Sequence, residues 1–220
     1  MTEKEKIQLA NLLVHSGAIR FGNFTTKSGI KSPYFVNLGA INQGDHLTLL
    51  GNFYAKTIIK RFATLPTCIF GPAYKAIPLA VATSTSLTQL TKTPISYTFN
   101  RKEKKAHGEG GIFVGSEPDK NDEILLIDDV ITDGEAKRET INLIQNYSEA
   151  KLVGILVCVD RLQPTAGRHS ALKNLEIQTK LPASALITIK EIIKFAKLNQ
   201  SLQQTVLTYI NKNTVADREN

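Results

Sequence analysis

The sequence predicts an α/β fold in which a central parallel sheet is flanked by helices. Short β-rich runs alternate with longer amphipathic helical patterns along most of the chain, which is typical of strands joined by crossover helices. One apolar run, Ile124 to Ile127, has the character of a buried parallel strand. With 220 residues the chain is long enough for one domain with a real core. A hydrophobic fraction of 42% and a charged fraction of 21% exclude the composition of a disordered chain.

The first part of the chain predicts a helix followed by a pair of strands. Thr2 and Glu5 have the spacing of a capping box, and apolar positions recur on one helical face from Ile7 to Val14. The stretch 18–38 has an alternating, β-rich pattern of residues that is interrupted by turn residues, which favours a hairpin-like strand pair. Steps of three and four residues between Leu47 and Ile58 predict a second helix.

Beyond this point strands and helices alternate. We expect strands over 67–70, 95–99, 124–127, 152–159 and 185–189, and helices over 77–90, 134–147, 192–198 and 202–210. The segment 213–220 has the character of a frayed tail. The absence of a linker or internal repeat predicts a single domain over residues 1–220 with a small N-terminal appendage.

Charge and cysteine content narrow the class of protein. The chain has 27 basic and 20 acidic residues, a net charge of +7 and a pI near 9.3, so anionic partners are favoured, phosphates first. Cys68 and Cys158 lie in apolar runs, which predicts buried thiols in a reduced cytoplasmic protein. Residues 1–6 include acids and are not followed by an apolar stretch of signal-peptide length, and no later apolar run is long enough to span a bilayer. We therefore expect a cytoplasmic protein without a membrane partner.

The most informative segment follows the apolar run 124–127. Asp128 and Asp129 are expected to end the strand, and the segment 132–135 turns into a helix, whose N-terminus offers free N–H groups to a phosphate. Successive strand side chains point to opposite faces, so one acid can take a sugar diol while the other supports it. A magnesium-binding strand of a nucleotide triphosphatase is an alternative, but no G-x-x-x-x-G-K-[ST] loop accompanies it. A purely structural strand end is the other alternative.

Four blocks in this sequence resemble the orotate phosphoribosyltransferases, a family of type I phosphoribosyltransferases. The stretch IDDVITDG at 127–134 is similar to the phosphoribosyl diphosphate signature of the type I enzymes. The blocks FTTKSGIKSPYF at 24–35, FGPAYKAIP at 70–78 and NRKEKKAHGEGG at 100–111 are similar to the orotate-type members, in the same order. The resemblance implies the type I phosphoribosyltransferase fold, with residues 1 to about 40 contributing a hood over the base site.

The resemblance also implies an activity. Orotate and 5-phosphoribosyl 1-diphosphate would give orotidine 5'-monophosphate and diphosphate in pyrimidine (UMP) biosynthesis. Mg²⁺ would be the cofactor, held through the substrate and not directly by protein ligands. A basic chain suits such a reaction, because the site must hold a polyanion and stabilise the charge on departing diphosphate. No covalent nucleophile is needed.

The segment 100–113 reads as a mobile lid that carries cations to the diphosphate. The resemblance implies that Arg101, Lys102, Lys105 and His107 contact substrate from the neighbouring subunit, and hence a homodimer with shared active sites. Lys102, Lys105 and His107, together with Asp129, would be catalytic. By itself this segment would equally suit a solvated basic loop or a nucleic-acid patch.

Further roles follow from the resemblance, residue by residue. Arg161 suits the planar carboxylate of orotate, although a structural ion pair is the alternative for it. The expected contacts to phosphoribosyl diphosphate outside the lid are Lys27, Tyr74, Lys75, Asp128, Asp129, Val130, Ile131, Thr132, Asp133, Gly134, Glu135 and Ala136. The expected contacts to orotate are Lys27, Phe35, Val36, Thr132 and Arg161.

The phosphate loop departs from the family pattern. Members commonly have a small residue at the position of Asp133 and Thr at that of Glu135, and two acids would repel a bound phosphate if they faced it. We expect Lys137 and Arg138 to offset the charge, or both carboxylates to point away. The alternative function is a catalytically impaired phosphoribosyltransferase-fold regulator that binds nucleic acid, but an intact cationic lid makes nucleic acid an unlikely partner. A transferase for a purine base is disfavoured by the block 24–35.

Overall fold

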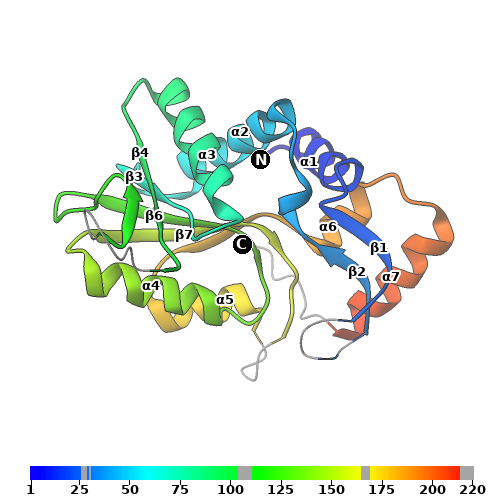
Figure 1. Cartoon of the computed structure of the whole chain (residues 1–220). Coiled ribbons are helices and arrows are strands. Elements are labelled where there is room, and N and C mark those ends of the chain that lie inside the picture. Colours follow the sequence, from blue (N-terminus) through cyan, green and yellow to red (C-terminus); the bar gives the residue numbers. More distant parts are fainter. Residues whose placement is uncertain (26–28, 30, 104–110, 165–168, 214–220) are drawn as a thin grey trace.

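A six-stranded sheet organises the molecule in the computed structural model, which describes residues 1–25, 29, 31–103, 111–164 and 169–213 (Figure 1). The strand order is β5-β4-β3-β6-β7-β8. All neighbours pair in parallel except β5, which runs antiparallel to β4 at the edge. The strands are β3 (Cys68–Phe70), β4 (Ser96–Asn100), β5 (Phe113–Gly115), β6 (Glu123–Ile131), β7 (Lys151–Asp160) and β8 (Ala183–Thr188). The parallel sheet is confirmed, whereas β5 was not predicted.

Helices cover both faces of this sheet (Figure 1). The helices α1 (Glu3–His15), α2 (Gly44–Arg61), α3 (Ala76–Thr91) and α6 (Ile189–Phe195) share one core with Leu125 and Ile127 of β6. The helices α4 (Glu135–Tyr147) and α5 (Ala171–Thr179) share a second core with Ile124 and Leu126. Alternate residues of one strand therefore serve opposite layers, as the period of two in a strand requires.

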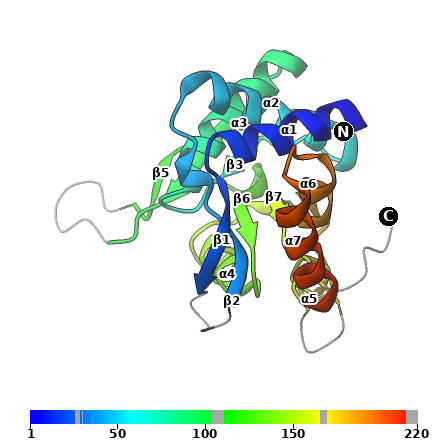
Figure 2. The same cartoon turned by 90° about the vertical axis from the view of Figure 1, so that its right-hand side faces the viewer.

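The N-terminal appendage is an antiparallel pair of strands outside the main sheet. It consists of β1 (Ile19–Thr25) and β2 (Lys31–Val36), followed by the short 3-10 helix η1 (Leu38–Ala40). Figures 1 and 2 show this pair and the last helix, α7 (Gln200–Asn213), at the same end of the molecule. The rings of Tyr34 in β2 and Tyr209 in α7 meet edge to face at 6.1 Å. The N-terminal strand pair is thus packed against the C-terminal helix α7.

Most predicted elements form where the patterns place them. The predicted capping box is present: the Thr2 hydroxyl accepts from the Glu5 N–H, and the Glu5 carboxylate accepts from the Thr2 N–H. One prediction was wrong: β6 does not end at the acid pair but continues to Ile131, because residues 128–131 still pair with 157–160 of β7. Helix α5 was not predicted. The expected frayed tail lies almost entirely outside the described residues.

Cys68 and Cys158 are free thiols in the core, as predicted. Burial raises the pKa of the Cys68 thiol to about 11, so this side chain is protonated and unreactive at neutral pH. Within the described part of the chain, no helix combines the length and the apolar character that crossing a membrane requires.

Candidate active site

The two acids of β6 lie at the carboxyl end of the central strands and face opposite layers. By the alternation of the strand, Asp128 is on the same face of β6 as Ile124 and Leu126, which face α4 and α5. Asp129 is on the other face, with Leu125 and Ile127. The predicted alternation is therefore confirmed, and each acid has its own surroundings. In an open parallel sheet, ligands bind beyond the carboxyl ends of the strands.

Asp129 is a buried carboxylate, 6% exposed. Desolvation raises the pKa of this carboxyl to about 6, the negative charge of Asp128 adds to the rise, and the cations of Lys137 and Lys75 oppose it. The Val130 N–H donates to Asp129 Oδ1 at 2.7 Å. Asp129 is consequently a strong hydrogen-bond acceptor in a water-poor position, which suits a hydroxyl ligand better than a cation.

Asp128 is held by partners from several directions. Its Oδ1 accepts from the Asp129 N–H at 2.8 Å, and its Oδ2 forms an ion pair with the Lys137 ammonium. The Tyr54 hydroxyl of α2 donates to the Asp128 carbonyl at 2.8 Å. Lys137 is buried against Asp128, so its ammonium is not paired with the acids of the phosphate loop, which was one of the two alternatives expected for them.

The segment between β6 and α4 forms the expected loop at a helix N-terminus. Gly134 has a φ of +82°, a left-handed conformation that glycine adopts without strain. Thr132, Asp133, Glu135 and Ala136 are exposed, whereas Ile131 is buried, which restricts any ligand contact of Ile131 to its backbone. The loop is therefore open to an anion on the side of these exposed residues.

The two unusual acids of this loop are exposed to solvent. The Asp133 carboxylate, one residue before the N-cap Gly134, bends back and accepts from the Glu135 N–H at 3.0 Å, so it satisfies the first amide of α4. The Arg138 guanidinium lies at 3.5 Å from the Asp133 carbonyl and at 3.4 Å from the Gln178 side-chain oxygen. Asp133 thus accepts a hydrogen bond from an amide that would otherwise be free to donate to a phosphate.

A second loop, 71–75, follows β3 and lies beside the acids. A Cβ at Gly71 would come within 2.4 Å of the Ala76 carbonyl, so only glycine allows this tight turn into α3. The Ala73 N–H donates to Asn100 Oδ1 at 3.0 Å, which ties the loop to the end of β4. Tyr74 and Lys75 are exposed, and the peptide between Ala73 and Tyr74 is cis. Both predicted diphosphate contacts are therefore presented to solvent.

The structure brings one lid residue onto this loop. The Lys102 ammonium lies 4.9 Å from the centre of the Tyr74 ring of the same chain. Lys102 thus lies beside the loop of its own chain, and its expected contact with substrate of a neighbouring subunit stays a prediction. The Arg101 N–H donates to the Ile112 carbonyl at 2.8 Å, and its buried Nε has no hydrogen-bond partner. The predicted residues Lys27, Lys105 and His107 lie outside the described part of the chain.

The hairpin carries the predicted base contacts. Phe35 is 40% exposed, but the next residue, Val36, faces the core and is 9% exposed. Because neighbours in a strand point to opposite faces, the two side chains cannot pack on the same base, and a contact of Val36 with orotate stays a prediction that only its backbone could make. Phe35 stacks on Phe24 at 5.6 Å, and the Arg20 guanidinium lies 5.6 Å from the Phe35 ring centre.

Arg161 follows β7 and faces the same hairpin. Its guanidinium lies 5.2 Å from the centre of the Tyr34 ring, and its buried Nε has no hydrogen-bond partner. A free donor of this kind fits a planar carboxylate. Sequence analysis missed Tyr34, Arg20 and Tyr54; Tyr34 stands next to Phe35 within a quoted block, whereas no local pattern distinguishes Tyr54.

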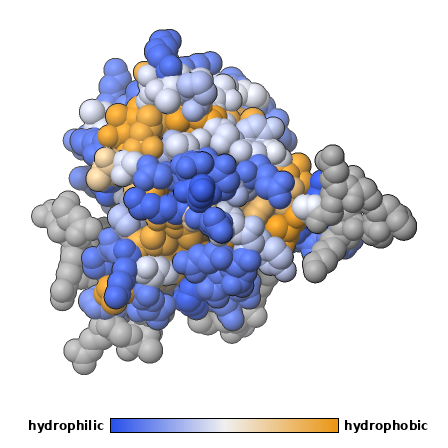
Figure 3. Space-filling model, turned by 90° about the vertical axis from the view of Figure 1, so that its left-hand side faces the viewer, coloured by the Kyte–Doolittle hydropathy of each residue, from blue (hydrophilic) through white to orange (hydrophobic). Residues whose placement is uncertain are grey.

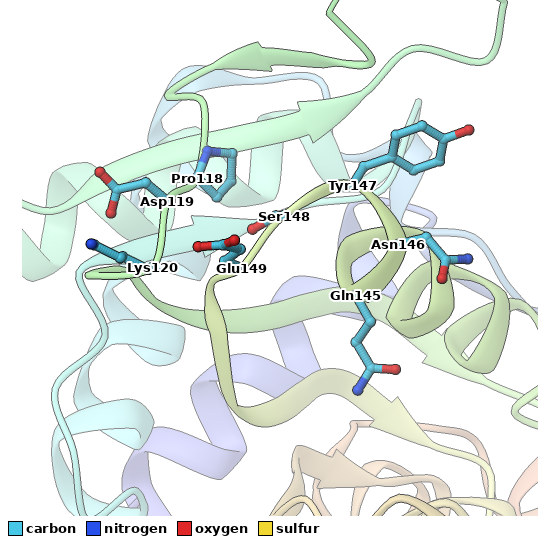
Figure 4. A pocket seen from close by; sticks show the side chains of 8 residues that line it. All are labelled: Pro118, Asp119, Lys120, Gln145, Asn146, Tyr147, Ser148 and Glu149. Atoms are coloured by element: carbon cyan, nitrogen blue, oxygen red, sulfur yellow. The ribbon is translucent and has the colours of Figure 1, made fainter.

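One hollow lies away from these residues, at the amino end of β6 and β7 (Figure 4). It has a volume of about 740 Å³ and is lined by residues 118–120 and 145–149. Asp128 and Asp129 lie toward the other end of β6, so this hollow is not part of the candidate site.

The described residues contain no cluster of three or more His, Cys, Asp or Glu side chains able to hold a metal ion. The two strand acids face opposite layers, and Asp128 is committed to Lys137. The expectation that Mg²⁺ is held through the substrate therefore stays a prediction.

Comparisons with known proteins agree with this geometry. Residues 37–181 match the phosphoribosyl transferase domain model. The chain is 40% identical over 211 residues to an orotate phosphoribosyltransferase of Bifidobacterium adolescentis, covering 93% of this chain and 91% of the relative. It is also similar to the crystal structure of orotate phosphoribosyltransferase from Francisella tularensis, with a TM-score of 0.77, 34% identity and coverage of 94% of this chain and 99% of that one.

A third comparison concerns the fold alone. The Mycobacterium tuberculosis orotate phosphoribosyltransferase, solved in complex with 5-phospho-alpha-D-ribosyl 1-diphosphate, is 20% identical to this chain. Its TM-score is 0.65, and the match covers 86% of this chain and 98% of that one. The chain belongs to the phosphoribosyl transferase domain family and, within it, to the orotate phosphoribosyltransferases.

Proposed function

We propose that this protein transfers the 5-phosphoribosyl group from phosphoribosyl diphosphate to orotate, giving orotidine 5'-monophosphate and diphosphate. One observation carries the proposal: the last part of β6, which contains Asp128 and Asp129, leads through the open loop 132–136 into the N-terminus of α4, beside the exposed pair Tyr74 and Lys75. This arrangement supplies separate places for a phosphate, a ribose and a diphosphate.

The loop 132–136 would bind the 5'-phosphate through backbone N–H groups at the start of α4, where the helix dipole favours an anion. Asp129 would accept hydrogen bonds from ribose hydroxyls, since burial and its short Val130 contact make it a fixed acceptor. Lys75 and Lys102 would bind the diphosphate on the side of Tyr74. Each group of the substrate thus meets a different structural element.

Bond breaking at the anomeric carbon places positive charge on the ribose and negative charge on the leaving diphosphate. The buried Asp129 carboxylate would stabilise the ribose charge, and the Lys102 ammonium would stabilise the growing charge of the diphosphate. Interactions that strengthen as the bond breaks raise turnover more than they raise affinity. The lid cations therefore act mainly on the transition state.

Orotate would lie between the hairpin and Arg161. The free Nε of Arg161 suits its carboxylate, and Tyr34 is the hairpin ring that the Arg161 guanidinium faces, at 5.2 Å. Phe35 lies on the opposite face of β2, so we expect its contact with orotate to be made by its backbone. Mg²⁺, when it enters with the diphosphate, would supply positive charge that neutralises the leaving group. The residues named here would hold it only through the substrate.

We infer a homodimer in which Lys105, His107 and Arg101 complete the partner's site, while Lys102 serves its own chain. Apolar side chains on α3 and β4 support an interface: Val81, Leu90 and Tyr97 are exposed by 37%, 47% and 37%. Figure 3 shows one face of the molecule, on which apolar patches lie among polar ones. The two buried free thiols suit a reducing cytoplasmic location.

The decisive assay follows the loss of orotate absorbance after purified protein is mixed with orotate, phosphoribosyl diphosphate and Mg²⁺. We expect turnover that requires all three and that is largely lost in Asp129→Asn. Binding of nucleic acid with a steep salt dependence and no turnover would refute the proposal and favour the regulator instead.

A further inference from the structure

Lys137 is a lysine buried at the carboxyl end of β6. The residue is 6% exposed, although its neighbours Ala136 and Glu139 on α4 are exposed. Its ammonium forms an ion pair with Asp128 Oδ2 and donates to the Val130 carbonyl at 2.8 Å. Burying an ammonium is costly unless it is paired and hydrogen-bonded, so both contacts are needed to keep it in this position.

This ion pair completes the restraint of Asp128. The other carboxylate oxygen already accepts from the Asp129 N–H at 2.8 Å, and the Tyr54 hydroxyl holds the Asp128 carbonyl from the opposite layer. The backbone of residue 128 is thus fixed by β6 and α2, while the direction of its carboxylate depends on Lys137. The same ammonium bridges the two ends of the phosphate loop, from Val130 to α4.

We propose that Lys137 is a positioning residue that acts through Asp128, fixing this carboxylate, and with it the entry to the phosphate loop, for the ribose 5-phosphate part of the substrate. The inference rests on the proposed function and names a residue beyond the substrate contacts. Lys137 itself touches no substrate group, because its ammonium is directed at Asp128 and Val130.

The test compares steady-state constants of Lys137→Met, Lys137→Arg and a matched control. The control is Lys151→Met, which removes a lysine 3.1 Å from Glu123 at the opposite end of β6. We expect Lys137→Met to raise the KM for phosphoribosyl diphosphate by about tenfold or more, since small displacements of positioning groups have effects of this size. The KM for orotate should stay within about twofold, Lys137→Arg should recover part of the loss, and the control should match wild type.

A double-mutant cycle with Asp128→Asn separates positioning from general damage. If Lys137 acts through Asp128, Lys137→Met should add little to the KM increase that Asp128→Asn already causes. The double variant also leaves no unpaired buried carboxylate at residue 128, so it stays measurable if Lys137→Met alone fails to fold. A further rise of about tenfold in the double variant over Asp128→Asn would overturn the inference.

The outcomes also distinguish this inference from the proposed function. Wild-type protein that consumes no orotate would refute the function itself. An active wild type combined with a Lys137→Met variant of unchanged KM, or with an equal effect in Lys151→Met, would overturn only the role of Lys137.

Discussion

We predict that the carboxylate of Asp133 weakens the binding of phosphoribosyl diphosphate and at the same time stabilises helix α4. It is exposed, and it accepts from the Glu135 N–H at 3.0 Å, an amide at the end of the helix that would receive the 5'-phosphate. Asp133→Asn removes the charge but keeps an oxygen that can cap the amide, whereas Asp133→Ala removes both. The two variants therefore separate the electrostatic effect from the capping effect.

The size of the electrostatic effect follows from exposure. Two unit charges about 6 Å apart repel by about 0.7 kcal/mol in water and by about 2.8 kcal/mol at an effective dielectric of about 20. Because Asp133 is exposed, the solvent-screened value applies to each unit of phosphate charge. Lys137 does not offset this repulsion, since its ammonium is paired with Asp128. Asp133→Asn should tighten binding by about three- to tenfold at low salt.

Titration calorimetry with phosphoribosyl diphosphate at low and high ionic strength measures this gain, which should shrink as salt is added. Thermal unfolding gives the second effect: Asp133→Ala should lower stability by about 1 kcal/mol and Asp133→Asn by less. The reasoning is refuted if Asp133→Asn binds no more tightly than wild type at low salt. The carboxylate would then exert no field on the phosphate.

Three further predictions test other parts of the site. Because burial raises the pKa of Asp129 from 3.8 to about 6, the folded state holds this proton more tightly than the unfolded state, and its contribution to stability falls as pH rises from about 4 to 6. Asp129→Asn should therefore raise the free energy of unfolding at pH 8 by up to about 3 kcal/mol in denaturant titrations and remove that pH dependence, while an unchanged value would contradict the burial argument. Arg161→Lys should raise the KM for orotate by about tenfold and leave that for phosphoribosyl diphosphate unchanged, since an ammonium cannot bind a carboxylate through two parallel bonds; equal effects on both constants would argue against a base-site role. Mixing Lys105→Ala with Asp129→Asn should restore about a quarter of wild-type activity through hybrid dimers, whereas mixing Lys102→Ala with Asp129→Asn should restore none; gain in neither mixture after verified subunit exchange would exclude shared sites.

The sequence predicted the features that depend on local patterns. The capping box at Thr2, the helical periodicities and the opposite directions of Asp128 and Asp129 all follow from the repeat of a helix or a strand. The end of β6 was misplaced because acids are poor strand formers, while pairing with β7 carries the strand on to Ile131. Strand β5 was missed because three residues are too few for a recognisable period.

Contacts across elements could not be predicted in this way. Lys137 was assigned to the neighbouring acids of the phosphate loop, whereas the packing of α4 on β6 directs it inward to Asp128. Val36 was predicted to contact the base together with Phe35, but neighbouring residues of a strand point to opposite faces. The period of two residues in a strand was enough to predict this difference. Tyr54 reaches Asp128 from 74 positions away, a contact that only the assembled layers create.

The most direct test of the account is base selectivity with product stoichiometry. Orotate, uracil, adenine and hypoxanthine are offered separately with phosphoribosyl diphosphate and Mg²⁺, and nucleotide and diphosphate are quantified by mass spectrometry. We predict orotidine 5'-monophosphate and diphosphate in equal amounts from orotate, and little product from the bases that lack a carboxylate for Arg161. Efficient transfer to a purine base, or no product from orotate, would contradict the account.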